Sequence, residues 1–231
     1  MPRASTLIER VETEDGPLEL RQSGAHFMIT IGPRVLMSSQ LTRSEVAVAQ
    51  LGCEPIRARP AARVLIGGLG LGFTLRAALD VLPKKARVVV AELNPVVERW
   101  CRGPLAVLTA DAVSDPRVQL RVGDVTRAIR DGAGRYDAII LDLYLGPEDP
   151  RPGRIDPLYG PEILSKTHAA LTAGGVYAVW SEEPNRLFEE RLKRAGFSVK
   201  LERPRGGGPR HAVYVATKIE VRSRARGPKN T

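Results

Sequence analysis

The feature that most constrains this chain is a glycine-rich loop that joins a short apolar run to a helical segment. The run spans residues 63–66, the loop Gly67-Gly68-Leu69-Gly70-Leu71-Gly72 follows it, and residues 73–81 fit a helix. Glycines let such a loop turn sharply and approach a ligand closely, and the first turn of the next helix presents free N–H groups to that ligand. This order of strand, loop and helix predicts a ligand site at the loop.

The spacing of the glycines narrows the choice of ligand. A dinucleotide-binding loop has the pattern G-x-G-x-x-G, but after Gly68 and Gly70 the third glycine would have to stand at Phe73. The loop instead fits G-x-G-x-G, and no G-K-[ST] follows that would make it a P-loop. A purely structural turn is the alternative for a glycine loop taken alone.

From residue 63 onward, apolar runs and helical segments alternate. Further strands are predicted at 87–92, 118–122, 136–142 and 175–180, and helices at 94–101, 125–131 and 160–171. Such alternation indicates a parallel sheet that helices cover on both faces. Runs at 197–201 and 212–217 add a closing hairpin at one edge. We therefore predict a doubly wound, mostly parallel, Rossmann-like α/β sheet.

The first fifty residues have a different pattern. Short strand-like runs at 18–22, 26–31 and 34–38 predict a small antiparallel β unit, and a helix is predicted at 44–50. We divide the chain into an N-terminal β-hairpin unit with its helix (1–52), a nucleotide-binding α/β domain (61–218) and a basic tail predicted to be disordered (219–231).

Composition excludes several classes of protein. No run approaches 18 apolar residues, so no transmembrane helix and no membrane partner are expected. Cys53 and Cys101 lack disulfide or metal spacing, which favours reduced thiols in a cytoplasmic protein without a metal site. Part of the net charge of +9 lies in the tail. We interpret the tail as a solvated end, with a salt-dependent contact to nucleic acid as the alternative.

Acidic residues stand where three of the predicted strands end. In an open α/β sheet the ligand crevice lies beyond the carboxyl ends of the strands. Glu92, followed by Leu93, is placed to accept hydrogen bonds from a ribose diol, with a solvated carboxylate as the alternative. Asp124 and the N–H group of Val125 suit an adenine, although Asp124 also suits a helix cap. Asp142 is the third acidic strand end, so one crevice with a nucleotide ligand is predicted.

At these residues the sequence resembles the spermidine synthase-like branch of class I S-adenosylmethionine-dependent transferases. The resemblance covers about residues 18–217 and rests on VLIGGLGLG, AELNPVVE, DPRVQLRVGD, YDAIILDLYLGP and LYGPEILSKTHAALTAGGVYAV. It implies S-adenosylmethionine or its decarboxylated form as the nucleotide, with Glu92 at the ribose, Asp124 at the adenine and the glycine loop beneath the methionine-like tail. It also implies a homodimer.

The sequence departs from that family at the substrate side. The acidic residue of the family's glycine loop is replaced by Gly70, the second acid of its Asp-x-x-Asp pair by Leu145, and its Tyr-His pair is absent after Glu45. A cationic diamine needs carboxylates to hold it and to take its proton. These losses favour methyl transfer from S-adenosylmethionine to a small molecule. The alternatives are an aminopropyltransferase that uses the decarboxylated nucleotide, a non-catalytic homologue, and a nucleic-acid methyltransferase that uses the basic tail.

The polar residues near the predicted crevice supply candidates for the acceptor side. Asp142 is the first candidate for catalysis and Tyr144 the second, as a lid or an orienting hydroxyl group. Glu148 and Asp149 could replace the missing base, with solvated loop charges as the alternative. Further substrate-side or crevice-shaping candidates are Gln40, His26 and the segment 180–183.

Overall fold

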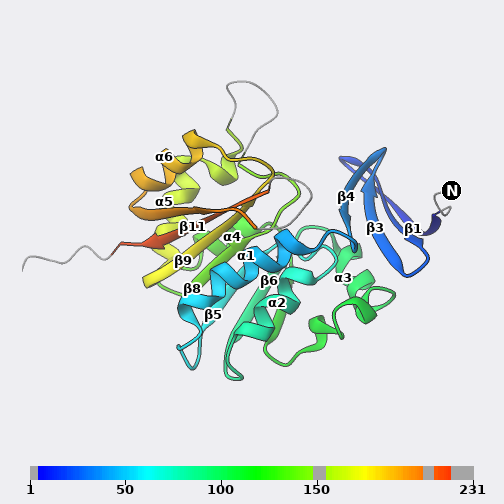
Figure 1. Ribbon diagram of the computed structural model, residues 1–231, viewed down its shortest axis with the longest axis horizontal. Coiled ribbons are helices and arrows are strands. Elements are labelled where there is room, and N and C mark those ends of the chain that lie inside the picture. The colour runs from blue at the N-terminus through cyan, green and yellow to red at the C-terminus, as the bar shows by residue number, and fades with distance from the viewer. Residues whose placement is uncertain (1–4, 148–154, 205–210, 220–231) are drawn as a thin grey trace, which may run out of the picture.

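The computed structural model describes residues 5–147, 155–204 and 211–219, and it contains two sheets (Figure 1). The larger sheet has seven strands in the order β10-β11-β9-β8-β5-β6-β7. Its strands are β5 (Arg63–Gly67), β6 (Arg87–Glu92), β7 (Val118–Val122), β8 (Tyr136–Leu141), β9 (Leu171–Ser181), β10 (Phe197–Glu202) and β11 (Ala212–Lys218). Strands β5 to β9 pair in parallel, whereas β11 pairs antiparallel with both β9 and β10. The predicted doubly wound sheet and its closing hairpin are confirmed.

Alternate residues of each central strand pack into different cores, which explains why these strands are apolar throughout. In β5, Val64 and Ile66 join one core while Leu65 joins the other. Side chains point to opposite faces at successive positions of a strand, so a strand covered on both faces needs apolar residues at every position. Helices α1 (Arg43–Cys53), α2 (Phe73–Val81) and α3 (Pro95–Arg102) contribute to the first core, and α4 (Val125–Arg130), α5 (Pro161–Ala170) and α6 (Arg186–Arg194) to the second.

Helix α1 packs on the large sheet, although the sequence pattern grouped it with the N-terminal unit. Its residues Val48, Ala49 and Cys53 are buried in the same core as the strands. A Cβ atom at Gly52 would lie 2.9 Å from Cγ1 of Ile140, so only glycine permits this close contact with β8. The small residues of α1 therefore place it on the sheet beside α2, with its first turn at the end where the parallel strands end.

The N-terminal unit is a four-stranded antiparallel sheet in the order β1-β2-β3-β4. It consists of β1 (Thr6–Thr13), β2 (Gly16–Ser23), β3 (His26–Ile31) and β4 (Arg34–Ser38). Strand β1 was absent from the sequence prediction because its side chains are mostly exposed and show no apolar face. Glu9 fastens β1 to α3, since one carboxylate oxygen accepts a 2.7 Å hydrogen bond from the Trp100 indole and the other accepts one from Arg99.

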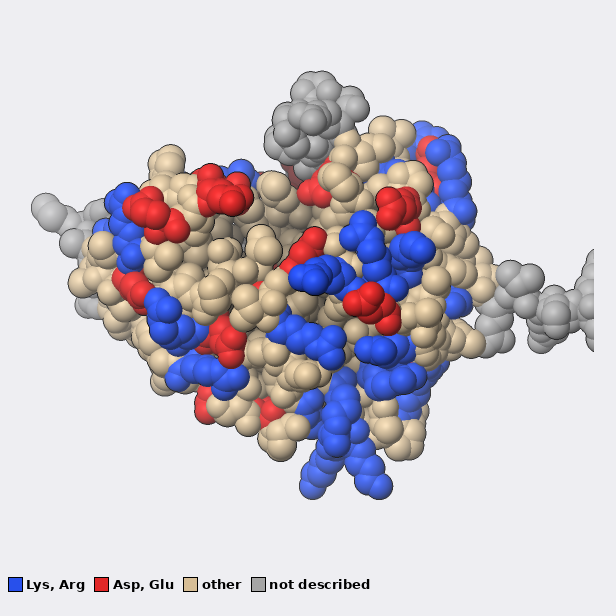
Figure 2. Space-filling view, turned by 180° about the vertical axis from the view of Figure 1, so that it is seen from behind, with Lys and Arg blue, Asp and Glu red and all other residues tan. Residues whose placement is uncertain are grey.

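Positive and negative side chains are mixed on the face of the molecule that Figure 2 draws. Helix α6 shows this mixture, with i,i+4 ion pairs Arg186–Glu190 and Lys193–Glu189 on its exposed side. Its only buried residues are Phe188 and Leu192, which explains why no helix was predicted there. Within the described ranges, no helix combines the length and apolar character needed to cross a membrane.

Candidate functional site

The glycine loop has the backbone conformation that its sequence suggests. Gly68, Gly70 and Gly72 have φ angles of 89°, 52° and 85°, a region that residues with a Cβ atom rarely adopt. A Cβ atom at Gly68 would lie 2.4 Å from the carbonyl oxygen of Asp142, so the loop passes directly over the end of β8. Gly72 precedes the first turn of α2. Gly67 is the last residue of β5, where a Cβ atom would lie 2.7 Å from Leu141.

Glu92 ties the glycine loop to the end of β6. One of its carboxylate oxygens accepts a 2.8 Å hydrogen bond from the N–H group of Leu69, and the other accepts a 2.9 Å bond from that of Asn94. The side chain is 8% exposed, and burial raises its pKa against the opposing effect of these N–H groups. The neighbouring Leu93 is 66% exposed. The carboxylate thus lies beside the loop as expected, and its ribose contact stays a prediction.

Asp124 caps helix α4. Its two carboxylate oxygens accept hydrogen bonds of 2.8 Å and 2.7 Å from the N–H and hydroxyl groups of Thr126. The residue is exposed, whereas Val125 is buried in the second core. The capping role considered for Asp124 is therefore present, and the adenine contacts of Asp124 and the Val125 N–H group stay predictions.

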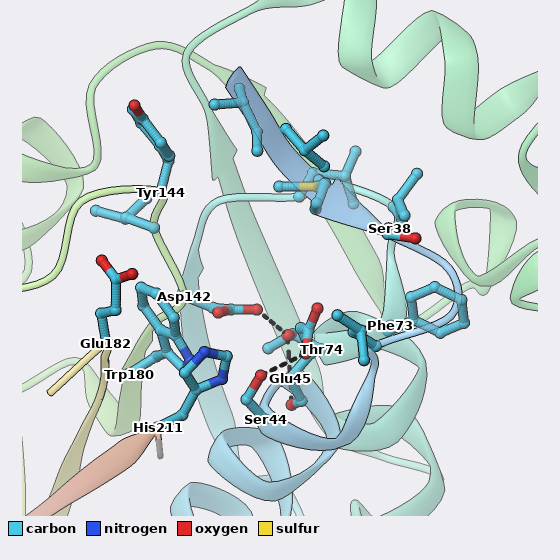
Figure 3. Close-up of a pocket in the computed structure, with 18 of the residues that line it drawn as sticks. Ser38, Ser44, Glu45, Phe73, Thr74, Asp142, Tyr144, Trp180, Glu182 and His211 are labelled. Atoms are coloured by element: carbon cyan, nitrogen blue, oxygen red, sulfur yellow. Dashed lines mark hydrogen bonds between the residues drawn. The ribbon is translucent and has the colours of Figure 1, made fainter. Parts of the chain in front are cut away.

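A cavity of about 350 Å³ opens beside the glycine loop, between the N-terminal unit and the large sheet (Figure 3). Its walls come from β4, from the start of α1, from the glycine loop and the first turn of α2, and from the ends of β8 and β9. Lining residues with polar or charged side chains are Arg34, Ser38, Ser44, Glu45, Thr74, Asp142, Tyr144, Trp180, Glu182 and His211. Apolar lining residues include Val35, Leu36, Met37, Leu69, Leu71 and Phe73. The cavity therefore has a polar side and an apolar side.

Asp142 lies on the polar side, partly buried and in contact with the cavity. The Thr74 hydroxyl group donates a short hydrogen bond to its Oδ2 atom. Burial raises the pKa of Asp142 to about 7, and the nearby charge of Glu45 acts in the same direction. This carboxyl group can therefore bind or release a proton close to neutral pH, which suits a general base.

Glu45 is the second carboxylate on this side, in the first turn of α1. The Ser44 hydroxyl group donates a 2.7 Å hydrogen bond to its Oε2 atom. Burial raises the pKa of Glu45 as well. Figure 3 shows Asp142, Thr74, Glu45 and Ser44 grouped together on one side of the cavity.

Aromatic side chains form the ends of the cavity. The Arg34 guanidinium carbon lies 4.5 Å from the centre of the Tyr144 ring, which joins β4 to the loop after β8. At the other end, Trp180 and His211 meet edge to face at 5.1 Å, next to Glu182. Burial lowers the pKa of His211. The lowered pKa favours the neutral form of His211 near pH 7. The lining of the cavity therefore contains three carboxyl groups, those of Glu45, Asp142 and Glu182, and few positive charges.

Comparison with known proteins identifies the fold. No family model matches the chain. A spermidine synthase from Thermotoga maritima superposes with a TM-score of 0.71 at 19% identity, over 92% of this chain and 72% of that one. A spermidine synthase in complex with the transition state analogue AdoDATO gives 0.71 at 18% identity, over the same shares.

Sequence relatives agree with the structural match. The chain is 28% identical over 127 residues to a polyamine aminopropyltransferase of Clostridium tetani, covering 55% of this chain and 43% of that protein. It is 31% identical over 146 residues to a polyamine aminopropyltransferase of Mycobacterium tuberculosis, a match that covers 62% of this chain and 27% of that protein. The chain is related to the polyamine aminopropyltransferases and has the spermidine synthase fold. The resemblance indicated by the sequence motifs is thus confirmed, although the matches span less than half the length of these two relatives.

The spermidine synthase fold brings some predicted acceptor-side residues together and leaves others apart. Asp142, Tyr144 and residues of the segment 180–183 line the cavity. Gln40 is exposed and does not line the cavity; its N–H group donates a 3.3 Å hydrogen bond to the Ser38 hydroxyl group. His26 is exposed at the start of β3 and is also absent from the lining. Glu148 and Asp149 lie outside the described residues.

Sequence reasoning missed six polar cavity residues: Arg34, Ser38, Ser44, Glu45, Thr74 and His211. Glu45 was noted only as the residue before an absent pair. A signal existed at Thr74, because a hydroxyl residue in the first turn after a glycine loop faces the ligand side of that loop. No local signal marks His211, which comes to the cavity only because β11 pairs with β9.

Proposed function

We propose that this chain transfers an aminopropyl group from decarboxylated S-adenosylmethionine to an amine that binds in the cavity. The observation that carries the proposal is the set of carboxylates Glu45, Asp142 and Glu182 around a cavity that adjoins the glycine loop. An amine acceptor is cationic at neutral pH, and carboxylates both attract it and accept its proton. The relation to polyamine aminopropyltransferases supports the same reaction.

This proposal reverses the preference drawn from the sequence. Methyl transfer was favoured because acids are missing at Gly70 and Leu145. Leu145 does not line the cavity, and its carbonyl oxygen accepts a 2.8 Å hydrogen bond from the Tyr159 hydroxyl group. Glu45 and Glu182 supply carboxylates from α1 and from the segment after β9 instead. The loss of acids at two positions therefore does not remove the acidic character that an amine requires.

The residues around the glycine loop suit an S-adenosyl nucleotide. The loop presents backbone without side chains at three positions, and the hydrogen bonds to Leu69 and Asn94 leave further acceptor capacity on Glu92 for ribose hydroxyl groups. Asp124 and the Val125 N–H group would meet the adenine. When bound, the nucleotide would supply the sulfonium leaving group, and the loop would direct it toward the cavity.

Asp142 and the cavity walls would perform the remaining chemistry. Asp142 would take a proton from the acceptor ammonium group, which frees the nitrogen lone pair. That nitrogen then forms a bond to the carbon beside the sulfonium sulfur, the carbon–sulfur bond breaks, and its electron pair stays on sulfur. Glu45 and Glu182 would hold the positive charge of the acceptor, and Tyr144 and Trp180 would limit its position. Alignment of nitrogen, carbon and sulfur supplies much of the rate in such a displacement.

One observation supports methyl transfer as a second candidate. A Cβ atom at Gly70 would lie 2.5 Å from the Met37 sulfur, so a thioether rather than a carboxylate stands beside this part of the loop. The amino group of the decarboxylated nucleotide would therefore have no acidic partner at this part of the loop. The carboxylate of S-adenosylmethionine would meet no negative charge there that repels it.

Calorimetric titration with S-adenosylmethionine and its decarboxylated form, followed by turnover with a series of amines, tests the proposal. We expect tighter binding of the decarboxylated form and amine-dependent release of the methylthio nucleoside. Preference for S-adenosylmethionine together with methylated products would establish the second candidate instead. Binding of neither nucleotide would contradict both and would favour a non-catalytic homologue.

A further inference from the structure

The two carboxyl groups on the polar wall of the cavity come from distant parts of the chain. Asp142 follows β8, and Glu45 lies in the first turn of α1. Thr74, in the first turn of α2, lies between them. Its hydroxyl oxygen donates to Asp142 and is 3.4 Å from the carbonyl oxygen of Glu45 (Figure 3). The packing of α1 against α2 therefore fixes the position of Glu45 relative to Asp142.

Positive charge does not neutralise this pair. Among the described residues, neither carboxyl group forms an ion pair, and the side-chain donors to them are the hydroxyl groups of Thr74 and Ser44. Arg34 also lines the cavity, but its guanidinium group stacks on Tyr144. Glu182 and His211 line the cavity too, and His211 lies beside Ser44 (Figure 3). Burial lowers the pKa of His211, which favours its neutral form. Two neighbouring carboxylates without a cation repel each other, and such a pair retains a proton more readily than either group alone.

We propose that Glu45 is a positioning residue for proton transfer, which keeps Asp142 able to accept the proton of the acceptor ammonium group. The inference rests on the proposed amine acceptor. Without the negative charge of Glu45, Asp142 would be a weaker base and would stay ionised to lower pH. With it, the proton that leaves the acceptor nitrogen passes to Asp142, and the nitrogen lone pair becomes available for attack on carbon. Both carboxyl groups are then needed, although only Asp142 touches the reacting nitrogen.

The direction of the pKa changes agrees with this role. Burial is the largest cause of the raised pKa of Asp142, the charge of Glu45 adds to it, and the Thr74 hydrogen bond opposes it. Glu182 lines the same cavity but is not among the causes. This difference provides a matched pair of substitutions, since Glu45→Gln and Glu182→Gln each remove one negative charge from the lining of the same cavity.

Carbon-13 NMR titration of the side-chain carboxyl groups measures the effect without any turnover. The Asp142 signal would be assigned by its loss in Asp142→Asn. We expect Asp142 to titrate near pH 7 in the wild type and about one pH unit lower in Glu45→Gln. Glu182→Gln should leave the Asp142 titration close to the wild-type value, and Glu45→Asp, which keeps the charge, should restore most of the shift.

An unchanged Asp142 titration in folded Glu45→Gln, or an equal shift in Glu182→Gln, would overturn the inference. Folding of each variant is checked by its amide NMR spectrum, and Glu45→Ala, which also removes the charge, serves if Glu45→Gln fails to fold. Where turnover is measurable, the acidic limb of the kcat/KM profile should move to lower pH in Glu45→Gln by the same amount. Absence of turnover in the wild type would count against the proposed function, whereas the NMR titration would still decide the role of Glu45.

Discussion

The carboxylates at the glycine loop and those in the cavity lie at the same end of the large sheet but have different partners. Glu92 and Asp124 accept hydrogen bonds from backbone N–H groups, which hold the loop to β6 and cap α4. Asp142 and Glu45 accept from hydroxyl groups instead. The first pair is therefore tied to neighbouring backbone, whereas the second pair lines the cavity, where burial raises the pKa of both carboxyl groups.

This difference separates positioning from chemistry within one site. The backbone N–H groups at Glu92 oppose the rise in pKa that burial causes, and they orient a carboxylate that suits the neutral hydroxyl groups of a nucleoside. A carboxylate enclosed in protein beside a like charge is stabilised in its protonated form, which suits the removal of a proton from an ammonium group. Substitutions in the two pairs should accordingly affect different measured quantities.

The largest effect is expected for Asp142→Asn. Asparagine keeps the shape and can still accept from Thr74, but it cannot take a proton. We expect kcat/KM to fall by about 10²- to 10⁴-fold, the range typical of a lost general base, with nucleotide affinity almost unchanged in calorimetry. Glu182→Gln is the matched control in the same cavity, with a smaller loss that appears in KM. Undiminished turnover by folded Asp142→Asn would show that another group takes the proton.

Glu92→Ala should act on nucleotide binding instead. Loss of hydrogen bonds to a charged acceptor weakens binding by roughly 1–3 kcal/mol, which is about a 5- to 160-fold rise in Kd. The melting temperature should fall as well, because the N–H groups of Leu69 and Asn94 lose their acceptor. Calorimetry and thermal unfolding measure the two effects, and Glu92→Gln tests how much depends on charge. Wild-type affinity in a folded variant would refute the ribose contact.

The apolar side of the cavity offers a test of donor selectivity. Gly70 has a φ of 52°, in a region that aspartate enters more readily than most residues, but Met37 fills the adjacent space. Gly70→Asp combined with Met37→Ala should therefore place a carboxylate beside the donor amine. We expect the ratio of affinities for the decarboxylated and carboxylated nucleotides to rise about tenfold, as one new charge-assisted contact would give.

The single variants are the controls for that pair. Met37→Ala alone should leave the ratio of affinities near its wild-type value, and Gly70→Asp alone should change it less than the double variant does. Calorimetric titration with both nucleotides gives the ratio for each protein. An equal change in Gly70→Asp alone would mean that Met37 does not restrict this part of the loop.

The difference between the glycine-loop side and the cavity side also shows what the sequence could and could not predict. Helix α2 and strands β6 and β7 have the predicted bounds, because each is a short apolar or amphipathic segment next to a glycine or an acidic strand end. The glycine loop, Glu92 and Asp124 were found because their roles depend on neighbours within a few residues. The proposed nucleotide side of the site is therefore local in sequence.

The cavity, by contrast, depends on tertiary contacts that no local pattern records. Glu45 faces Asp142 because small residues let α1 lie against β8, and His211 meets Trp180 because β11 pairs with β9. The sequence favoured methyl transfer because the acids expected at Gly70 and Leu145 are missing. A comparison of fixed positions does not detect carboxylates that other elements bring to the same cavity. The acceptor side could be judged only once the elements were placed in space.

The smallest expected effect separates the two roles of Asp124. Asp124→Ala removes the cap of α4, which costs about 1 kcal/mol of the free energy of unfolding, and it removes any contact with adenine. Serine also caps helices well, so Asp124→Ser should restore most of the stability while the carboxylate stays absent. If Asp124 binds the adenine, nucleotide affinity should remain lowered by about three- to tenfold in Asp124→Ser, the value of one hydrogen bond whose acceptor is exposed to solvent. Recovery of both stability and affinity in Asp124→Ser would leave the residue with its capping role alone, and would move adenine recognition to the backbone N–H group of Val125.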